Sequence, residues 1–108
     1  VDIYYAIPSF FETPKGRQIY DWLVLNAPQF GFCQTYEEKG TRLSGYQEEK
    51  WHWSYLPLAK NFTDRYKTLI RESDLGGLPA QAGFLGAEYL ASQNIINDYV
   101  LSINPECL

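Results

Sequence analysis

The sequence predicts a single α+β domain in which a small antiparallel sheet packs against helices. Its 108 residues are enough for one hydrophobic core and too few for two. Aromatic residues make up 17% of the chain and charged residues only 20%, a composition typical of a folded domain. Segments with the period of strands and segments with helical spacing follow one another in the order β-α-β-β-α-α. This order places residues 1–108 in one such unit.

The first half of the chain contains three of these elements. Residues 1–7 are rich in β-branched and aromatic residues and stop at a proline, as a short strand does. Thr13 is a good N-cap before a proline at the first helical position, so we expect a helix over about 14–26. Residues 31–36 predict a second strand. The polar, glycine-bounded stretch 37–45 that follows is expected to be an exposed connection.

The second half begins with a strand and ends with two helices. Over residues 46–55 aromatic residues alternate with polar ones, which is the period of a strand with two different faces. The two tryptophans of this strand then share the core face, and His52 points away from both. Apolar spacing predicts a helix that continues to the glycine pair at 76–77 and a final helix over about 86–103.

Charge and hydropathy narrow the classes of partner. The formal net charge is -4, and the nine basic residues are scattered, so we expect no nucleic-acid partner, whose phosphates need clustered Lys and Arg. No apolar run approaches the roughly 18 residues of a membrane span. The two cysteines, Cys33 and Cys107, exclude a thiol-based zinc finger and a dense disulfide scaffold. They leave open one disulfide or two separate buried thiols.

His52 and its acidic neighbours form the densest group of potential functional residues. A neutral imidazole binds zinc and titrates near neutral pH, so His52 can be a metal ligand or a general base. Glu49 lies three residues earlier, and a carboxylate beside a zinc-bound water can take its proton. Residues three apart on an ideal strand face opposite sides, so Glu49 joins His52 only where a bulge or the strand's entry re-aims it. The alternatives are a structural histidine and a solvated Glu48–Glu49 pair.

Residues 45–55 carry a resemblance to a known family. The run Glu-Lys-Trp-His within them resembles the Glu-x-Trp-His signature of the D-alanyl-D-alanine carboxypeptidase (VanY-like) family of zinc peptidases, which trim bacterial wall peptides. A second family motif, Ser-x-His-x-x-Gly-x-x-x-Asp, is matched only at its last residue, by Asp2. The resemblance implies a DD-peptidase/Hedgehog-like fold, with Zn2+ bound by Asp2 and His52 and with Glu49 as the catalytic base.

The family resemblance also implies a substrate and a location. The motif's first histidine would precede Asp2, so we expect residues 1–108 to be the C-terminal part of a peptidase catalytic domain, with weak zinc binding and no useful turnover alone. The implied substrate is the terminal D-alanine of a peptidoglycan stem peptide, cut with D,D- or L,D-specificity. Gln34, Tyr36 and Arg42 are candidates for binding its carboxylate. A wall substrate implies a periplasmic or extracytoplasmic location, with membrane attachment through upstream residues as an option.

Two other functions stay open at this point. The first is a non-catalytic domain that binds or scaffolds wall peptides and keeps the fold without a metal. The second is a thiol enzyme in which Cys33 attacks acyl groups with the help of His52. A metal content measurement separates the zinc peptidase from both.

Overall fold

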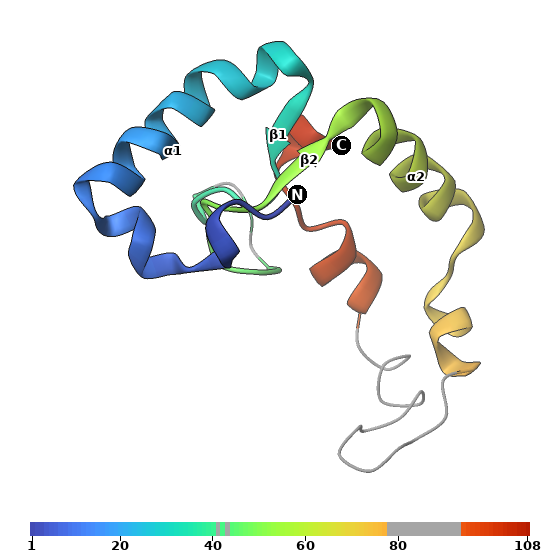
Figure 1. The fold of residues 1–108 in the computed structure, drawn as a ribbon. Coiled ribbons are helices and arrows are strands. Elements are labelled where there is room, and N and C mark those ends of the chain that lie inside the picture. The colour runs from blue at the N-terminus through green and yellow to red at the C-terminus, as the bar shows by residue number, and fades with distance from the viewer. Residues whose placement is uncertain (41, 43, 78–93) are drawn as a thin grey trace.

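The protein is built around a small two-stranded sheet with one long helix on each side, as a computed structural model shows (Figure 1). The antiparallel strands are β1 (Phe32–Gln34) and β2 (Trp53–Tyr55), and their register sets Gln34 opposite Trp53. This mixed architecture confirms the predicted α+β class and the antiparallel sheet. The structure describes residues 1–40, 42, 44–77 and 94–108.

The helix α1 (Pro14–Asn26) lies where the sequence predicts it. Its N-terminus is capped by Thr13, whose Oγ1 accepts a hydrogen bond from the Gly16 N–H at 3.0 Å. The preceding turn, Pro8–Glu12, packs against the start of the helix and buries Phe11, which is 1% exposed. Local signals were sufficient here because the cap and the first-turn proline act within a few residues.

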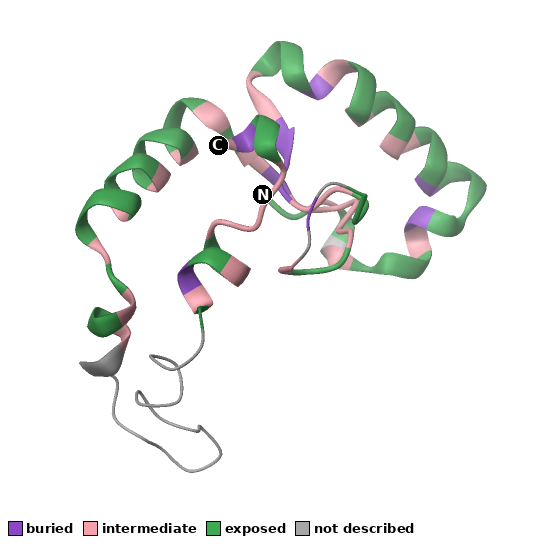
Figure 2. Cartoon of the chain, turned by 180° about the vertical axis from the view of Figure 1, so that it is seen from behind, coloured by how far each residue is buried: buried purple, intermediate pink, exposed green. Residues whose placement is uncertain are grey.

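The helix α2 (Leu56–Leu69) follows β2 directly and ends earlier than predicted. Residues 72–77 form a separate short 3-10 turn, so the glycine pair at 76–77 does not end the main helix. No residue of α2, which is described throughout, is buried, and Phe62 is 72% exposed. Figure 2 accordingly shows α2 as mostly exposed. The apolar side chains whose spacing predicted this helix are therefore not buried against the sheet.

The predicted strand over residues 1–7 is wrong beyond Ile3. Asp2 pairs with His52 in an isolated antiparallel bridge, and Tyr4–Ala6 then forms a 3-10 turn. Positive φ angles of 54° at Tyr4 and 53° at Ala6 bend the chain away from the sheet. The opposite segment turns at Glu49, so residues after Ile3 have no strand to pair with, and β propensity alone does not keep them extended.

Two further sequence expectations also need correction. The predicted strand over 46–55 is regular only at β2, because the same turn interrupts it. The predicted final helix lies partly outside the described residues, and in the described part Ile96–Val100 forms a single π-type turn. The expected end at residue 103 is wrong. Ser102 leaves the helical path because its carbonyl accepts a hydrogen bond from Arg42 Nη1 at 3.1 Å and its hydroxyl donates to the Ser44 carbonyl at 2.9 Å.

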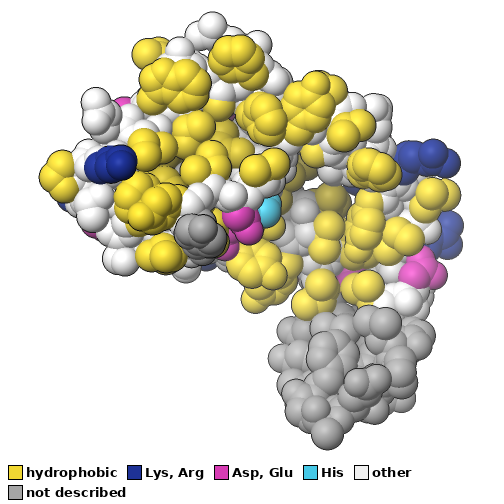
Figure 3. Space-filling view, in the orientation of Figure 1, with side chains coloured by type: hydrophobic (Ala, Val, Ile, Leu, Met, Phe, Trp, Pro, Cys, Tyr) yellow, Lys and Arg dark blue, Asp and Glu magenta, His cyan; other side chains and the backbone are white. Residues whose placement is uncertain are grey.

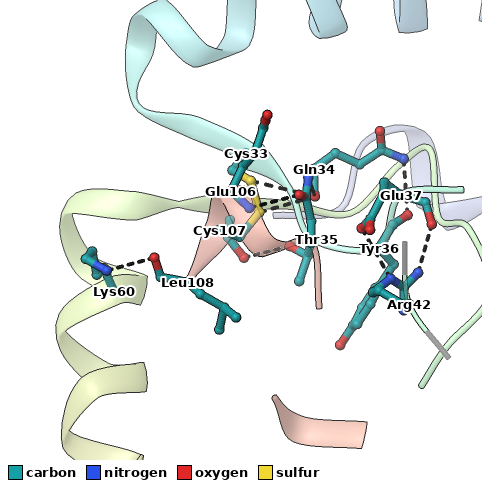
Figure 4. The surroundings of a disulfide bond; sticks show 12 residues. Cys33, Gln34, Thr35, Tyr36, Glu37, Arg42, Lys60, Glu106, Cys107 and Leu108 are labelled. Carbon is teal, nitrogen blue, oxygen red and sulfur yellow. Dashed lines mark hydrogen bonds and ion pairs between the residues drawn. A yellow bond between two sulfur atoms is a disulfide. The ribbon is translucent and has the colours of Figure 1, made fainter. Parts of the chain in front are cut away.

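A disulfide joins the central sheet to the C-terminal segment. Cys33 in β1 and Cys107 near the C-terminus are bridged, with their Cα atoms 5.7 Å apart (Figure 4). Asn104 strengthens this junction, because its backbone N–H donates to the Thr35 carbonyl at 2.9 Å and its side-chain amide donates to the Gln34 carbonyl at 3.0 Å. The sequence left open a bridge or two thiols, and the structure has the bridge. No helix of the described ranges has the length and hydrophobicity to cross a membrane.

Candidate active site

The N-terminal segment lies along the free edge of the β2 region and places Asp2 beside His52. The Ile3 N–H donates to the Trp51 carbonyl at 3.0 Å, and the Trp53 N–H donates to the Val1 carbonyl at 2.9 Å. Directly paired residues of an antiparallel bridge extend their side chains to the same side. Residues far apart in sequence are therefore held side by side by backbone hydrogen bonds.

The side chains of Asp2 and His52 are in direct contact. Asp2 Oδ1 and His52 Nδ1 are 2.7 Å apart, the distance of a strong hydrogen bond. The Asp2 side chain is 54% exposed and the His52 side chain 33% exposed, so solvent and small solutes reach the pair. A carboxylate oxygen and an imidazole nitrogen at one accessible point are donor atoms of the kind that bind Zn2+.

Glu49 joins this pair through a turn. The His52 N–H donates to the Glu49 carbonyl at 3.2 Å, and the Glu49 N–H donates to the Tyr36 carbonyl at 2.9 Å. Glu49 Oε2 then lies 3.9 Å from His52 Nδ1. The turn changes the direction of the chain between these residues, which an ideal strand does not do. The side chains of Glu49 and His52 therefore lie on one side of the sheet.

The three residues expected to bind the substrate differ in their surroundings. The buried side chain of Gln34 accepts from the Tyr20 hydroxyl at 2.8 Å and donates to the Tyr36 carbonyl at 3.2 Å, so its polar atoms bind the protein itself. The Tyr36 ring lies 5.3 Å from the His52 ring and borders the site directly. Burial raises the pKa of Tyr36, and the neighbouring Tyr46 and Glu49 raise it further, so its hydroxyl stays protonated.

Arg42 is the third candidate, and it is only 7% exposed. Its guanidinium donates to the carbonyls of Tyr46 and Ser102, both at 3.1 Å, and to the Glu37 carbonyl at 2.8 Å. Its Nε also lies 3.2 Å from a carboxylate oxygen of Glu37 (Figure 4). The predicted exposed connection thus contains a buried arginine that holds two loops together. The assignment of Gln34, Tyr36 and Arg42 to the substrate carboxylate stays a prediction.

Sequence reasoning missed a groove that continues from this site. Its volume is about 470 Å³, and the described residues of its lining are tyrosines, an isoleucine and a valine. Tyr36 and Tyr46 lie on one side of it, and Tyr99 comes from the distant C-terminal segment. No local signal links residues 46 and 99, because the contact depends on how the C-terminal segment returns to the sheet. The lining residues are Tyr36, Tyr46, Ile95, Tyr99 and Val100.

The structure also rules out one of the alternatives. Cys33 is bonded to Cys107, so neither cysteine of the sequence is a free thiol. The proposed Cys33 nucleophile is therefore wrong. Within the residues that the structure describes, no group of three or more His, Cys, Asp or Glu side chains is placed to hold a metal ion. The sequence contains one histidine, so the two-histidine set of the resemblance is not completed from these residues.

Comparisons with known proteins agree on one family. The chain is 29% identical to a D-alanyl-D-alanine carboxypeptidase of Enterococcus faecium over 72 residues, which is 67% of this chain and 22% of that protein. It is 37% identical to a protein of the same name from Enterococcus faecalis over 41 residues, which is 38% of this chain and 15% of that protein. The chain thus spans less than a quarter of the length of either relative. No solved structure matches it.

The match to the family covers the site. The family model described as "VanY: D-alanyl-D-alanine carboxypeptidase" matches residues 2–58, which include the segment paired with β2, both strands and the turn at Glu49. This range is more than half of the chain. The protein belongs to the VanY family of D-alanyl-D-alanine carboxypeptidases.

Proposed function

We propose that this chain forms part of the catalytic centre of a zinc-dependent carboxypeptidase that releases the terminal D-alanine of peptidoglycan stem peptides. In this proposal Asp2 and His52 are metal ligands and Glu49 is the general base. The observation that carries the proposal is the convergence of these three side chains at one solvent-accessible edge of the sheet. Their separations are 2.7 Å for Asp2 to His52 and 3.9 Å for Glu49 to His52.

The donor pair fits Zn2+ in type and nearly in spacing. Ligand atoms about 2.1 Å from a tetrahedral zinc lie about 3.4 Å from each other. The hydrogen-bonded atoms of Asp2 and His52 are 2.7 Å apart, so metal binding requires them to separate by a small rotation of exposed side chains. Binding also requires the proton between them to leave, because the ligand nitrogen must be unprotonated. Glu49 Oε2 lies 3.9 Å from the same imidazole nitrogen, and in this proposal Glu49 acts on a water and is not a ligand.

The chemistry divides between the metal and the protein. When bound, Zn2+ polarises the peptide carbonyl and lowers the pKa of a water. Glu49 takes a proton from the attacking water as its oxygen bonds to the carbonyl carbon, and it gives that proton to the D-alanine nitrogen as the C–N bond breaks. Before a metal binds, the hydrogen bond between Asp2 and His52 holds the two proposed ligand side chains side by side.

The proposed location follows from the substrate and from the disulfide. Disulfides persist in oxidising compartments and are rare in the cytosol. The Cys33–Cys107 bridge is consistent with an extracytoplasmic location, where peptidoglycan is found. The partner proposed for the chain is accordingly a wall peptide, and the net charge of -4 disfavours a nucleic acid.

A second candidate function is a wall-peptide binding domain without metal. The observation that favours it is the direct hydrogen bond between Asp2 and His52 at 2.7 Å, in which each side chain is the partner of the other. The sequence also has a single histidine, which leaves two protein ligands where a catalytic zinc has three. The two functions share the groove and differ in metal binding.

Zinc titration of the 108-residue chain separates them. We expect one site per chain, weaker than that of a three-ligand centre, and at least a tenfold weaker affinity in His52→Ala and in Asp2→Asn. Asp64→Asn on the exposed surface of α2 is the matched control for the loss of a carboxylate, and its affinity should equal that of the wild type. Equal zinc affinity of the wild type and His52→Ala would reject the proposed ligands and favour the wall-peptide binding domain without metal.

Catalysis needs a protein in which the motif's first histidine is joined to these residues. Such a protein should release D-alanine from N-acetyl-Lys-D-Ala-D-Ala in the presence of zinc, and a chelator should stop the release. The 108 residues alone should give no useful turnover. Absence of release from the completed, zinc-loaded site would overturn the carboxypeptidase assignment.

A further inference from the structure

One buried side chain, that of Gln34, bonds to the turn that carries Glu49. Its amide nitrogen donates to the Tyr36 carbonyl at 3.2 Å and to the Glu49 carbonyl at 3.4 Å. The same two carbonyls accept from the backbone N–H groups of Glu49 and His52, and those two bonds close the turn. The Gln34 amide therefore bridges the two hydrogen bonds that bring Glu49 next to His52.

Gln34 reaches this turn from the face of the sheet opposite the candidate active site. It lies directly across from Trp53 in the register of β1 and β2, and directly paired residues extend their side chains to the same face. Trp53 follows His52, and successive residues of an extended segment point to opposite faces. Figure 3 shows the histidine at the surface beside acidic side chains, whereas Gln34 is only 8% exposed. Gln34 thus acts on the site through the backbone and does not share a face with the imidazole.

The direction of the Gln34 amide is fixed by its partners. The two carbonyl oxygens only accept hydrogen bonds, so the NH2 end of the amide must face them. The amide oxygen then faces the Tyr20 hydroxyl of α1, which donates to it at 2.8 Å. A reversed amide would place its oxygen against both carbonyl oxygens and lose both bonds to the turn. Tyr20 therefore favours the one direction in which Gln34 holds the turn.

Only the Glu49 part of the site depends on Gln34. Asp2 is placed beside His52 by backbone hydrogen bonds of the N-terminal segment, in which the Gln34 side chain takes no part. Both carbonyls that Gln34 contacts also keep a backbone N–H as donor. Loss of the Gln34 amide should therefore loosen the turn and leave the sheet and the pair of proposed ligands in place.

The position of a general base decides how well it works. The base must lie within hydrogen-bond reach of the proton that it takes, directly or through one water. A displacement of about 1 Å can reduce the rate about 100-fold. The separation of 3.9 Å between Glu49 Oε2 and His52 Nδ1 is set by the turn, so a side chain that stabilises the turn also stabilises this separation.

We propose that Gln34 is a positioning residue, which holds the backbone of Glu49 so that the Glu49 carboxylate stays beside His52. Tyr20 contributes by fixing the direction of the Gln34 amide. This inference rests on the proposed function, because it takes Glu49 to be the base. It gives Gln34 a role different from contact with the substrate carboxylate, and kinetic constants separate the two roles.

Amide hydrogen exchange in the metal-free 108-residue chain tests the hold of Gln34 on the turn. Gln34→Met keeps the length of the side chain and removes its donors without adding a charge. Exchange at the N–H groups of Glu49 and His52 should accelerate about fivefold, the effect of one hydrogen bond of ordinary strength. The Leu56 N–H, which donates to the Gly31 carbonyl at 2.8 Å, should change by less than about twofold. Unchanged exchange in the turn, or equal acceleration at all three amides, would overturn the proposal.

Two further variants locate the effect. Gln18→Met makes the same replacement at an exposed position of α1 and should leave exchange in the turn unchanged. Tyr20→Phe keeps the ring and removes the hydroxyl that fixes the Gln34 amide, so it should accelerate the same turn amides by a smaller factor, about twofold. If Gln34→Met does not fold, Tyr20→Phe decides the question, and unchanged exchange in the turn would then refute the proposal.

Kinetics of a completed, zinc-loaded protein test the consequence for hydrolysis. Gln34→Met should lower kcat about tenfold or more, while KM and zinc affinity stay within about twofold of the wild type. A raised KM with unchanged kcat would assign Gln34 to substrate binding and overturn the positioning role. In a Glu49→Gln background, Gln34→Met should reduce kcat by less than about a further twofold, because it acts through Glu49. An undiminished further loss would place its effect elsewhere.

The exchange measurement keeps this inference separate from the proposed function. Local acceleration by Gln34→Met, combined with no turnover by the completed zinc-loaded protein, would support the hold of Gln34 on the turn and reject the peptidase. Turnover that Gln34→Met leaves unchanged would support the peptidase and reject the positioning role.

Discussion

The backbone carbonyl of Glu49 accepts a hydrogen bond from the N–H of His52 at 3.2 Å, and the turn closed by this bond sets the two side chains 3.9 Å apart. The same turn is held from β1, because the Glu49 N–H donates to the Tyr36 carbonyl at 2.9 Å. Glu49 is therefore positioned by the backbone and independently of any charge on its side chain. A change of its carboxylate to an amide should leave the turn intact.

Glu49→Gln should separate metal binding from hydrolysis. The amide is isosteric and the proposed role of Glu49 is that of a base and not of a ligand, so zinc affinity should stay within about twofold of the wild type. The amide cannot accept the proton of the attacking water, so a zinc-loaded protein with a complete ligand set should lose at least about 100-fold in kcat. Zinc titration and D-alanine release measure the two effects. Full activity in Glu49→Gln would remove Glu49 from the chemistry.

Local sequence signals predicted the parts of the fold that depend on local interactions. The helix α1 follows from the cap at Thr13 and a first-turn proline, and β1 lies within the strand predicted over residues 31–36. The strand over residues 1–7 was predicted too long, because β propensity says nothing about where the partner strand turns away. That turn at Glu49 is set by a bond to Tyr36, which no local pattern reveals.

The site was predictable in its residue types and only partly in its geometry. A motif match selected Asp2, Glu49 and His52, and the structure brings these three together. The groove was not predictable, because Tyr99 reaches Tyr46 only through the return of the C-terminal segment to β1. That return depends on the disulfide and on the buried Arg42, whose bonds connect residues far apart in sequence.

Replacing the disulfide should destabilise the protein. Cys33 and Cys107 are separated by 74 residues, and a cross-link over a loop of this length restricts the unfolded chain strongly. We expect Cys107→Ser to lower the free energy of unfolding by about 2–5 kcal/mol, measured by urea titration. Wild type in reducing agent should show a similar loss, whereas Cys107→Ser should not respond to reducing agent. Equal urea-unfolding midpoints for the reduced and the oxidised wild type would contradict a stabilising role of the disulfide.

Gly16→Ala should destabilise the protein although alanine favours helices. A Cβ at Gly16 would collide with the Phe10 carbonyl oxygen and lie 2.8 Å from the Phe11 Cα, both of which are backbone atoms that cannot move aside. The turn before α1 would have to shift, at a cost of about 1–3 kcal/mol. Thermal or urea unfolding measures the change.

Gly40 provides the matched control for this substitution. Among the described residues, nothing lies within 4 Å of a Cβ placed at Gly40. Gly40→Ala should change the free energy of unfolding by less than about 0.5 kcal/mol. A stability of Gly16→Ala equal to that of Gly40→Ala would show that the start of α1 is not packed as described.

The hydroxyl of Tyr20 should titrate about two pH units later than that of an exposed tyrosine. Burial is the larger cause and the Glu48 carboxylate, 3.2 Å away, the next, and together they raise the pKa of Tyr20 to about 12. The hydroxyl also donates to the side-chain carbonyl of Gln34 at 2.8 Å, which connects α1 to β1. The folded protein therefore holds this proton more tightly than the unfolded chain does.

The sign of the linked stability change follows from that raised pKa. The Tyr20 proton contributes to the free energy of unfolding in full below pH 10, the ordinary pKa of tyrosine. This contribution is lost as the pH rises from 10 through about 12. The difference in phenolate absorbance between wild type and Tyr20→Phe isolates the titration of this one side chain. Glu48→Gln should lower the pKa of Tyr20, because it removes the negative charge beside the phenol. A Tyr20 that titrates near pH 10 in the folded protein would contradict the network that joins α1 to Gln34.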